Sequence, residues 1–450
     1  MDVLALDVRL DRSNDPVGVL VRDQRGGLAF AYNEKYVSQP GAISLSLSLP
    51  LTSEPFEEVI ARPFFDNLLQ ERDGALSDIM AREAISRDDI AGLLFHLGKD
   101  CAGALSILPA GAPPTKVPGD YRTDYQRIDD ARLIAIVDSL HKRRRLPAGT
   151  DDPSPLAGMQ SKIALTVLPD GSLAEPIPGS GAPTTHILKV PDQDHIHDGS
   201  LEFETMLLSQ EIGISTADVA LLPIADLKVL LVTRFDRARD KDDRVVRIHQ
   251  EDFAQALGLP AALKYERRGA PGRRFDVDAV RRILDATTDP AGEKELFIQA
   301  TLFDLMVGNV DAHAKNFALF HEPGGRIRTT PRYDLLPTRL DNNLTDELAY
   351  TIGNATTLDD ISREDFDRFL VSIGVPSAAA RQRVTKRLAT EIANKLAGHL
   401  DRLGRSGQKP FADLIASNMR SLLGALEIDV PGPAKDRDAY IGRAGGWLLS

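Results

Sequence analysis

The segment GNVDAHAKNF, residues 308–317, combines residue types that phosphoryl transfer requires. Asn316 follows Asp311 by five positions, which is the spacing found in the catalytic loops of protein kinases. In such loops the aspartate accepts the proton of the attacking hydroxyl, and the asparagine oxygen binds magnesium. Between them, Lys315 is placed to meet the transferred phosphoryl group and His313 to hold the loop shape. The alternative is a polar helix cap in which Asp311 satisfies backbone amides.

Two further charged positions fit the same chemistry. Asp334 follows Asn316 by 18 positions, where a kinase needs a second carboxylate for the metal that bridges the β- and γ-phosphates. Lys189 interrupts the apolar, strand-like segment THILKV, in which a charge is costly unless it is paired. An ATP phosphate and Glu202, at the start of the periodic segment EFETMLLSQEIG, are suitable partners. The alternative for Lys189 is a side chain that extends from an edge strand into solvent.

Two other segments are candidates for contacts with the rest of the nucleotide. LAGMQSKIAL, residues 156–165, is a glycine-containing turn before a strand, and the backbone amides of such a turn can bind phosphates. It is not a Walker A loop, because no second glycine followed by Lys and Ser or Thr is present. LVTRFDR, residues 231–237, ends a predicted strand where a kinase hinge would hydrogen-bond adenine. The candidate segments therefore occur in the order that a kinase requires.

Several elements must position these residues. Alternating segments predict strands over 3–10, 17–21 and 28–32, with a turn at Gly26 and Gly27. Residues 43–51, ISLSLSLPL, alternate apolar residues with serine and predict a half-buried strand or an extended edge. A helical pattern follows over 56–97, and a short helix is predicted over 129–142, after a linker rich in Pro and Gly at 109–120.

A strand-rich part followed by a helical part predicts an α+β fold with a ligand cleft between the two. We expect five regions: an N-terminal subdomain at 1–108, a linker and short helix at 109–150, an ATP-binding region at 151–236, a helical catalytic lobe at 237–430 and a C-terminal tail at 431–450.

Composition narrows the class of protein. A net charge of -12 argues against a protein that grips phosphate backbones over its whole surface. The basic run 142–145 is interpreted either as a solvated helix end or as a phosphate-contacting patch. Cys101 is the one cysteine, the acidic start differs from a signal peptide, and no apolar stretch approaches the roughly 20 residues that span a bilayer. We therefore expect a cytoplasmic protein with no membrane partner.

These segments resemble the HipA family over nearly the whole chain. The resemblance is carried, in order, by ISLSLSLPL, FFDNLLQER, LAGMQSK, PTTHILK, RFDR, QEDFAQALG, KYE, GNVDAHAKNF and PRYDLLP. It implies a two-lobed, protein-kinase-like fold and a serine/threonine protein kinase that acts as the toxin of a toxin–antitoxin module. The implied targets are aminoacyl-tRNA synthetases, whose phosphorylation arrests growth. The implied partners are a HipB-like helix-turn-helix antitoxin and, mainly through it, operator DNA.

The resemblance also implies roles for individual positions. It makes Asp311 the catalytic base and Asn316 and Asp334 the ligands of Mg²⁺, and Glu202 corresponds to the family's helical acid. The residues implied to bind ATP are Ala157, Gly158, Met159, Gln160, Ser161, Lys162, Lys189, Thr233, Arg234, Phe235 and Asp334.

Two positions depart from the family pattern. Several members phosphorylate their own serine three residues before the glycine of the phosphate turn, and this chain has Pro155 there with Ser154 beside it. Ser154 is either a candidate autophosphorylation site or a turn serine that caps its own loop. Thr233 stands where some members carry a glutamate, and backbone contacts to adenine are expected to survive that change.

Two other functions use the same residues. One is a kinase-shaped, non-catalytic co-repressor that acts with a DNA-binding antitoxin, and the other is a small-molecule phosphotransferase. The intact set of Lys189, Asp311, Asn316 and Asp334 argues against the first. The resemblance of the N-terminal part to HipA argues against the second.

Overall fold

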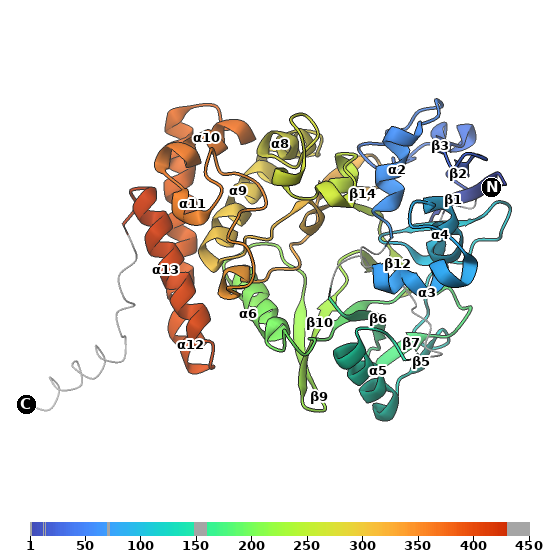
Figure 1. The fold of residues 1–450 in the computed structure, drawn as a ribbon, viewed down its shortest axis with the longest axis horizontal. Coiled ribbons are helices and arrows are strands. Elements are labelled where there is room, and N and C mark those ends of the chain that lie inside the picture. The colour runs from blue at the N-terminus through green and yellow to red at the C-terminus, as the bar shows by residue number, and fades with distance from the viewer. Residues whose placement is uncertain (1, 12, 14, 70–72, 148–159, 430–450) are drawn as a thin grey trace, which may run out of the picture.

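The computed structural model describes residues 2–11, 13, 15–69, 73–147 and 160–429. In Figure 1 the N-terminal elements lie on one side of the molecule, the helices that end the chain lie on the other, and a green sheet lies between and below them. Each of these parts has its own buried hydrophobic cluster. No described helix is both long enough and apolar enough to cross a membrane.

The N-terminal part is an antiparallel sheet of order β3-β2-β1-β4, covered by helices. The first three strands confirm the predicted ones, and β4 returns from the end of this part to pair with β1. Fully buried aromatic side chains, including Phe30, Phe64 and Phe65, fill its core. The elements are β1 (Leu4–Leu10), β2 (Gly18–Arg22), β3 (Leu28–Tyr32), α1 (Glu34–Val37), α2 (Glu58–Asp66), α3 (Asp73–Glu83), α4 (Ile90–Leu97), a 3₁₀ turn (Gly98–Asp100) and β4 (Leu105–Pro109).

The prediction of a strand over residues 43–51 is wrong. The Tyr32 hydroxyl accepts the Leu45 amide at 2.7 Å and donates to the Leu49 carbonyl at 2.6 Å. The Leu47 amide donates to the Glu251 carboxylate at 2.9 Å, and the Ser46 hydroxyl also donates to that carboxylate. The alternation therefore reflects contacts with side chains from two parts of the protein, which replace pairing with a neighbouring strand.

The middle part is an antiparallel sheet of order β5-β7-β6-β8-β10-β9. One face packs against α5, which confirms the short helix predicted over 129–142 and has Asp129 as its N-cap. Met206 and Leu208 of α6 belong to the core of the helical half, so this helix joins the two halves. The elements are β5 (Tyr125–Arg127), α5 (Asp130–Arg143), β6 (Lys162–Val167), β7 (Leu173–Pro176), β8 (His186–Lys189), α6 (Asp198–Glu211), β9 (Val219–Ile224) and β10 (Leu227–Thr233).

The basic run at the end of α5 is exposed. Lys142 pairs with Asp138 of the same helix at 2.6 Å, and Arg144 pairs with Asp192 at 2.8 Å. These contacts favour the interpretation of a solvated helix end.

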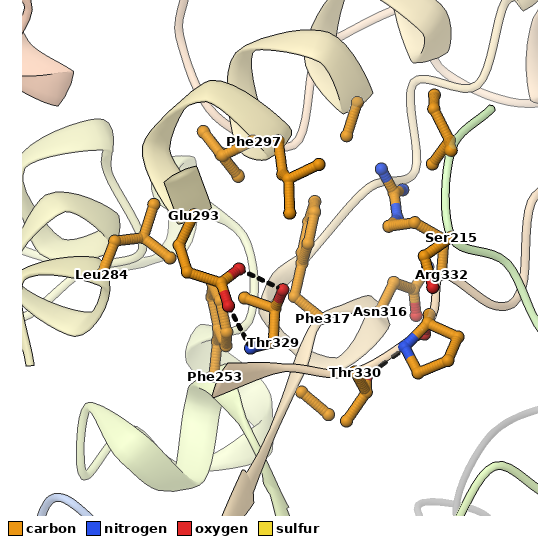
Figure 2. Close-up of a pocket in the computed structure, with 15 residues that line it drawn as sticks. Ser215, Phe253, Leu284, Glu293, Phe297, Asn316, Phe317, Thr329, Thr330 and Arg332 are labelled. Atoms are coloured by element: carbon orange, nitrogen blue, oxygen red, sulfur yellow. Dashed lines mark hydrogen bonds between the residues drawn. The ribbon is translucent and has the colours of Figure 1, made fainter. Parts of the chain in front are cut away.

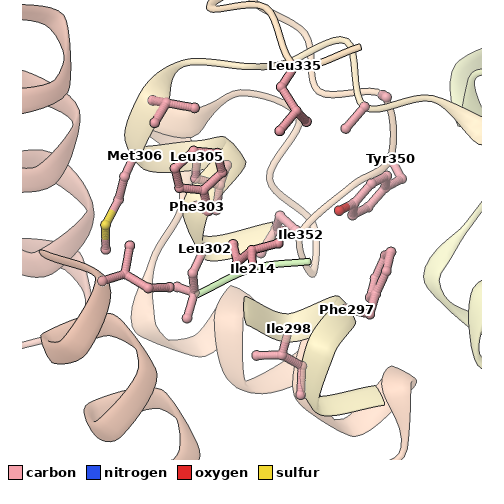
Figure 3. Packing of buried hydrophobic residues seen from close by; sticks show 14 of the residues in the cluster. Ile214, Phe297, Ile298, Leu302, Phe303, Leu305, Met306, Leu335, Tyr350 and Ile352 are labelled. Carbon is pink, nitrogen blue, oxygen red and sulfur yellow. The ribbon is translucent and has the colours of Figure 1, made fainter. Parts of the chain in front are cut away.

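The remaining part is mainly helical and is built around α9. Apolar side chains surround α9 on most sides, which is the pattern of a helix buried in a core, and Figure 3 shows its Leu302, Phe303, Leu305 and Met306 packed among neighbouring elements. The helices are α7 (Phe253–Ala256), α8 (Val277–Asp285), α9 (Pro290–Val307), α10 (Arg363–Ile373), α11 (Ala378–Ala397), α12 (Leu400–Arg405) and α13 (Lys409–Ala425). The strands are β11 (Arg237–Arg239), β12 (Val245–Arg247), β13 (Gln250–Asp252), β14 (Ala318–Glu322) and β15 (Arg326–Thr329). Short 3₁₀ turns are Ala261–Leu263, Glu266–Arg268, Ala314–Asn316, Thr338–Leu340 and Leu358–Asp360.

A buried histidine joins the N-terminal part to the helical part. His249 is 3% exposed, and its Nε2 donates to the Leu45 carbonyl at 2.8 Å. Burial, assisted by the neighbouring His321, lowers the pKa of His249 to about 3.

We expect the free energy of unfolding to fall as the pH decreases from about 6.5 towards 4, because the unfolded chain gains a proton on His249 that the folded protein does not accept. The contribution of this residue is about 1.4 kcal/mol per pH unit. His249→Gln keeps a donor for Leu45 and should remove that part of the slope in urea unfolding measured from pH 4.5 to 7. His197→Gln, at an exposed histidine, is the control. An unchanged slope in His249→Gln would contradict this account.

Candidate active site

Lys189, the last residue of β8, lies at the centre of a cluster of charges. Its Nζ is 2.6 Å from Glu202 Oε1 and 2.6 Å from Asp334 Oδ1. The Glu202 side chain, on α6, is 1% exposed, whereas that of Asp334 is 43% exposed. The edge-strand alternative for Lys189 is wrong, because β8 lies between β6 and β10 and pairs with both.

Burial and charge act in opposite directions in this cluster. Burial would lower the pKa of Lys189, but the two carboxylates raise it above its ordinary value. Burial would raise the pKa of Asp334, yet Lys189 outweighs it and holds that pKa well below its usual range. For Glu202, burial prevails over Lys189 and the pKa is raised. The Glu202 Oε2 has no hydrogen-bond partner among the described residues, so the contact with Lys189 is the main interaction that stabilises the buried negative charge of Glu202.

Asp334 has an unusual backbone conformation. Its φ is +59°, in the left-handed region that residues other than glycine rarely occupy. Contacts of the two preceding residues hold this segment in place. Arg332 lies 2.9 Å from the buried Asp304, and the Tyr333 hydroxyl donates to the Lys315 carbonyl at 2.8 Å. Strain of this kind persists only where the surroundings impose it, and it is concentrated at functional sites.

The loop after α9 brings Asp311 and Asn316 together. The helix ends at Gly308, whose φ of +80° suits a residue without a Cβ. The Asp311 carbonyl then accepts the Asn316 Nδ2 at 2.9 Å and the His313 amide at 2.7 Å. The Asn316 Oδ1 accepts no hydrogen bond from a described residue, and the Asp311 residue is only partly buried. Both oxygen-bearing groups are therefore available to a ligand.

Tyr265, for which the sequence predicts no individual role, donates its hydroxyl to Asp311 Oδ1 at 2.6 Å. Its ring also packs edge-on against His313, with 5.1 Å between centroids. No described backbone amide bonds to the Asp311 carboxylate, so the helix-cap alternative is wrong within the described residues. KYE belongs to the family pattern, but no local spacing rule relates position 265 to position 311.

The contacts of Lys315 argue against the predicted contact with a phosphoryl group. The residue is 8% exposed, and its Nζ lies 2.8 Å from Asn67 Oδ1 and 2.9 Å from Asp252 Oδ2. Asn67 ends α2 in the N-terminal part, and Asp252 is the N-cap of α7. Lys315 therefore fastens the candidate catalytic loop, residues 308–317, to Asn67 and Asp252.

Two backbone amides of the predicted hinge already donate hydrogen bonds within the protein. The Thr233 amide donates to the Asp218 carbonyl at 2.8 Å, and the Arg234 amide to the Thr185 carbonyl at 2.9 Å. The Arg234 guanidinium is buried and bonds to Asp236. The predicted role of residues 233–235, which is backbone contact with adenine, stays a prediction. Phe235 packs against Phe320 and Tyr333, and so links the hinge to the segment that carries Asp334.

Only part of the predicted phosphate turn is within the described residues. Ala157, Gly158, Met159 and the candidate Ser154 lie outside them. Ser161 continues the sheet, with its carbonyl accepting the Val190 amide at 2.8 Å. Lys162 stands opposite Lys189 in the β6–β8 register. Its charge also lowers the pKa of Asp334, although by less than Lys189 does. A hollow of about 20 Å³ is lined by Gln160 and Ser161 together with Lys189 and Glu202.

Figure 2 shows a different cavity, behind the catalytic loop. It is lined mainly by apolar side chains such as Phe253, Phe297 and Phe317, and touches Asn316 at one end. Its volume of about 50 Å³ has room for a few water molecules and not for a nucleotide.

A larger groove, of about 580 Å³, adjoins Tyr265. It runs between the α2 and α4 side of the N-terminal part and the segment 261–268. Arg62, Arg87, Lys264 and Arg268 line it, with Asp66 and Asp88 as the acidic residues.

Comparisons with known proteins cover nearly all of the chain. Residues 6–108 match the HipA N-terminal domain, and residues 154–400 match the HipA-like C-terminal domain. The candidate kinase Y4mE of Sinorhizobium fredii is 37% identical over 372 residues, which is 82% of this chain and 86% of Y4mE. The serine/threonine-protein kinase toxin HipA of Shewanella oneidensis is 29% identical over 372 residues, which is 80% of this chain and 81% of that protein.

A solved structure of a HipA protein has a similar fold. A chain in the complex of Shewanella oneidensis MR-1 HipA, HipB and operator DNA superposes with a TM-score of 0.77 and 25% identity. The match covers 94% of this chain and 100% of that one. It confirms the predicted α+β fold, with a strand-rich N-terminal part and a more helical C-terminal part.

Lys189→Met should destabilise the protein by about 3–5 kcal/mol, because it leaves the buried Glu202 carboxylate without its counter-ion. Lys189→Met combined with Glu202→Gln should recover much of that loss, since no buried charge then remains uncompensated. Urea unfolding of the two single variants and the double variant forms a cycle that isolates the pair. Additive losses would show that the contact is not a coupled pair.

Proposed function

Because this chain belongs to the HipA family of serine/threonine protein kinases, we propose that it transfers the γ-phosphoryl group of ATP to a protein hydroxyl at the site described above. The observation that carries the proposal is the contact of Lys189 with both Glu202 and Asp334. A strand lysine paired with a helical glutamate and placed beside a metal-binding aspartate is the arrangement that protein kinases use to hold the phosphates.

Asp311 is the proposed base. As the acceptor oxygen forms its bond to the γ-phosphorus, the bond from that phosphorus to the bridging oxygen breaks and ADP leaves. The acceptor proton goes to the Asp311 carboxylate. Since little covalent chemistry is required of the protein, placement of the two reactants and electrostatic stabilisation supply most of the catalysis.

Lys189 is proposed to orient the α- and β-phosphates while Glu202 keeps its ammonium in place. The two carboxylates keep the pKa of Lys189 high, so that a positive charge faces the phosphates at neutral pH. Lys162 is on the same face of the sheet and adds a second cation. The adenine would lie against the hinge, where Phe235 and the carbonyl groups of 233–235 are the candidate contacts. The turn predicted from the sequence at 157–162 would cover the phosphates.

The residues present fit magnesium. Hard cations prefer oxygen ligands, and Asn316 Oδ1 and the Asp334 carboxylate are such ligands. Among the described residues no group of three or more His, Cys, Asp or Glu side chains is arranged for a metal, so phosphate oxygens and water would complete the coordination. When bound, magnesium neutralises charge on the β- and γ-phosphates.

The groove beside Tyr265 is the proposed path of the protein acceptor. It is bordered by Tyr265, whose hydroxyl bonds to Asp311, and it is lined by four cations and two acidic residues in a protein whose net charge is -12.

We extend the proposal to a toxin–antitoxin role. The Shewanella relative is named a toxin, and its solved complex contains HipB and operator DNA. By that likeness the partner of this chain is a HipB-like antitoxin, DNA is contacted mainly through it, and the module acts in the cytoplasm. An aminoacyl-tRNA synthetase is the proposed target by family resemblance.

Asp311→Asn keeps the shape of the side chain and an acceptor for Tyr265 but removes the base. It should lower the rate of phosphoryl transfer by about 10²- to 10⁴-fold while leaving the fold intact. The measurement is labelling by radioactive ATP in a cell lysate, followed by identification of the labelled protein. Asp413→Asn, an exposed position on α13, is the control. Unchanged labelling by Asp311→Asn would contradict the assignment.

ATP should raise the melting temperature, and magnesium should increase the effect. At a ligand concentration of 100 Kd the stabilisation is about 2.7 kcal/mol. Asp334→Asn should lose the magnesium-dependent part because one oxygen ligand loses its charge. If the wild type shows no shift with ATP, with or without magnesium, a non-catalytic scaffold becomes the better assignment.

A further inference from the structure

The hydroxyl of Tyr265 lies on the proposed catalytic base. It donates to Asp311 Oδ1 at 2.6 Å, and Oδ2 accepts no hydrogen bond from a described residue. One carboxylate oxygen is thus held, and the other remains for the acceptor hydroxyl. A hydrogen bond from a neutral donor to a carboxylate is among the stronger ones that proteins make.

The segment that carries Tyr265 is itself attached to the catalytic loop. The Lys264 carbonyl accepts the Ala314 amide at 3.1 Å. On the other side, the Glu266 amide donates to the Ala349 carbonyl at 2.9 Å, and the Ala349 amide donates to the Val310 carbonyl at 3.1 Å. Tyr265 and Asp311 therefore belong to one hydrogen-bonded unit, which limits how far either can move relative to the other.

The surroundings keep the phenol in its donor form. Burial and the Asp311 carboxylate raise the pKa of Tyr265 well above its ordinary value. Arg267 and Arg268 lie over the ring at 4.3 and 5.0 Å from its centroid, and Lys264 lies at 5.7 Å. These cations hold the ring in position, and Lys264 and Arg268 also line the groove.

We propose that Tyr265 is a positioning residue for phosphoryl transfer: it holds one oxygen of Asp311 so that the other meets the acceptor hydroxyl entering from the adjoining groove. The proposal rests on the assignment of Asp311 as the base. The competing interpretation is that the phenol occupies the place of the acceptor and blocks it. Positioning is favoured, because the phenol takes only one of the two carboxylate oxygens and its segment is bonded to the loop at other points.

Tyr265→Phe tests the proposal, since it keeps the ring and its packing and removes the donor. We expect kcat to fall by about 10- to 100-fold, because the lost hydrogen bond is to a charged group. The KM for ATP should be unchanged, and the melting temperature should stay close to that of the wild type. The assay is the initial rate of transfer from radioactive ATP to the lysate protein that the wild type labels. The lysate concentration is fixed and ATP is varied, so the kcat compared is the apparent value at that acceptor concentration.

Tyr350→Phe is the matched control. Tyr350 is buried in the helical half and shares a hydrogen bond with Thr301 at 2.9 Å, but it does not hydrogen-bond to Asp311. Its kcat should equal that of the wild type. In an Asp311→Asn background, measured in single-turnover assays, Tyr265→Phe should cause no further loss, because its effect passes through the carboxylate.

The possible outcomes separate this proposal from the proposed function. An active wild type with an equally active Tyr265→Phe variant would overturn the positioning role and leave the kinase assignment intact. A higher kcat in the variant would show that the phenol blocks the acceptor. Equal losses in Tyr265→Phe and Tyr350→Phe would mean a general packing effect. If the wild type transfers no phosphate, the assignment of Asp311 as base fails, and the role of Tyr265 fails with it.

Discussion

One ammonium group, held between two carboxylates, determines how the proposed site is assembled. Lys189 is on a central strand, Glu202 is on a helix whose apolar residues belong to the core of the helical half, and Asp334 is on a loop with a strained backbone. Burial of Glu202 makes its negative charge costly without Lys189, so the ion pair and the packing of α6 are interdependent. The same contact sets the distance between the sheet and the segment that carries the candidate metal ligand.

The N-terminal part contributes to the site without supplying one of its proposed catalytic groups. Lys315, next to Asn316, bonds to Asn67 of this part, and Glu251 accepts hydrogen bonds from the segment 43–51. The catalytic loop and strand β13 are therefore both fastened to the same neighbour. Because buried polar contacts of this type must be satisfied together, undocking the N-terminal part would leave several groups near the catalytic loop unpaired.

Sequence patterns predicted two kinds of feature correctly: elements with a local periodicity, and buried charges that cannot be stable without a partner. Strands β1–β3 follow from alternation over five to seven residues, and a lysine in an apolar strand requires partners wherever they lie in the chain. Local signals failed where distant contacts decide the structure. The alternation at 43–51 reflects hydrogen bonds to Tyr32 and Glu251 instead of a strand. Lys315 bonds to Asn67, which lies far from it in the sequence. The contact of Tyr265 with Asp311 follows from no spacing rule that could be recognised in a single sequence. The divisions at residues 108, 150, 236 and 430 stay a prediction.

The unequal burial of the two carboxylates indicates how the cluster can respond to a ligand. With a side chain only 1% exposed, Glu202 has no access to water that could replace Lys189, and loss of its partner would leave a buried, uncompensated charge. The Asp334 side chain is 43% exposed, so water or a cation can replace the lysine there at much smaller cost. If a phosphate binds Lys189 as proposed, it would therefore displace the contact with Asp334 more readily than the contact with Glu202. That order of replacement would leave the lysine anchored on the helix side while the Asp334 carboxylate turns to a metal ion, which is the division of roles that phosphoryl transfer requires.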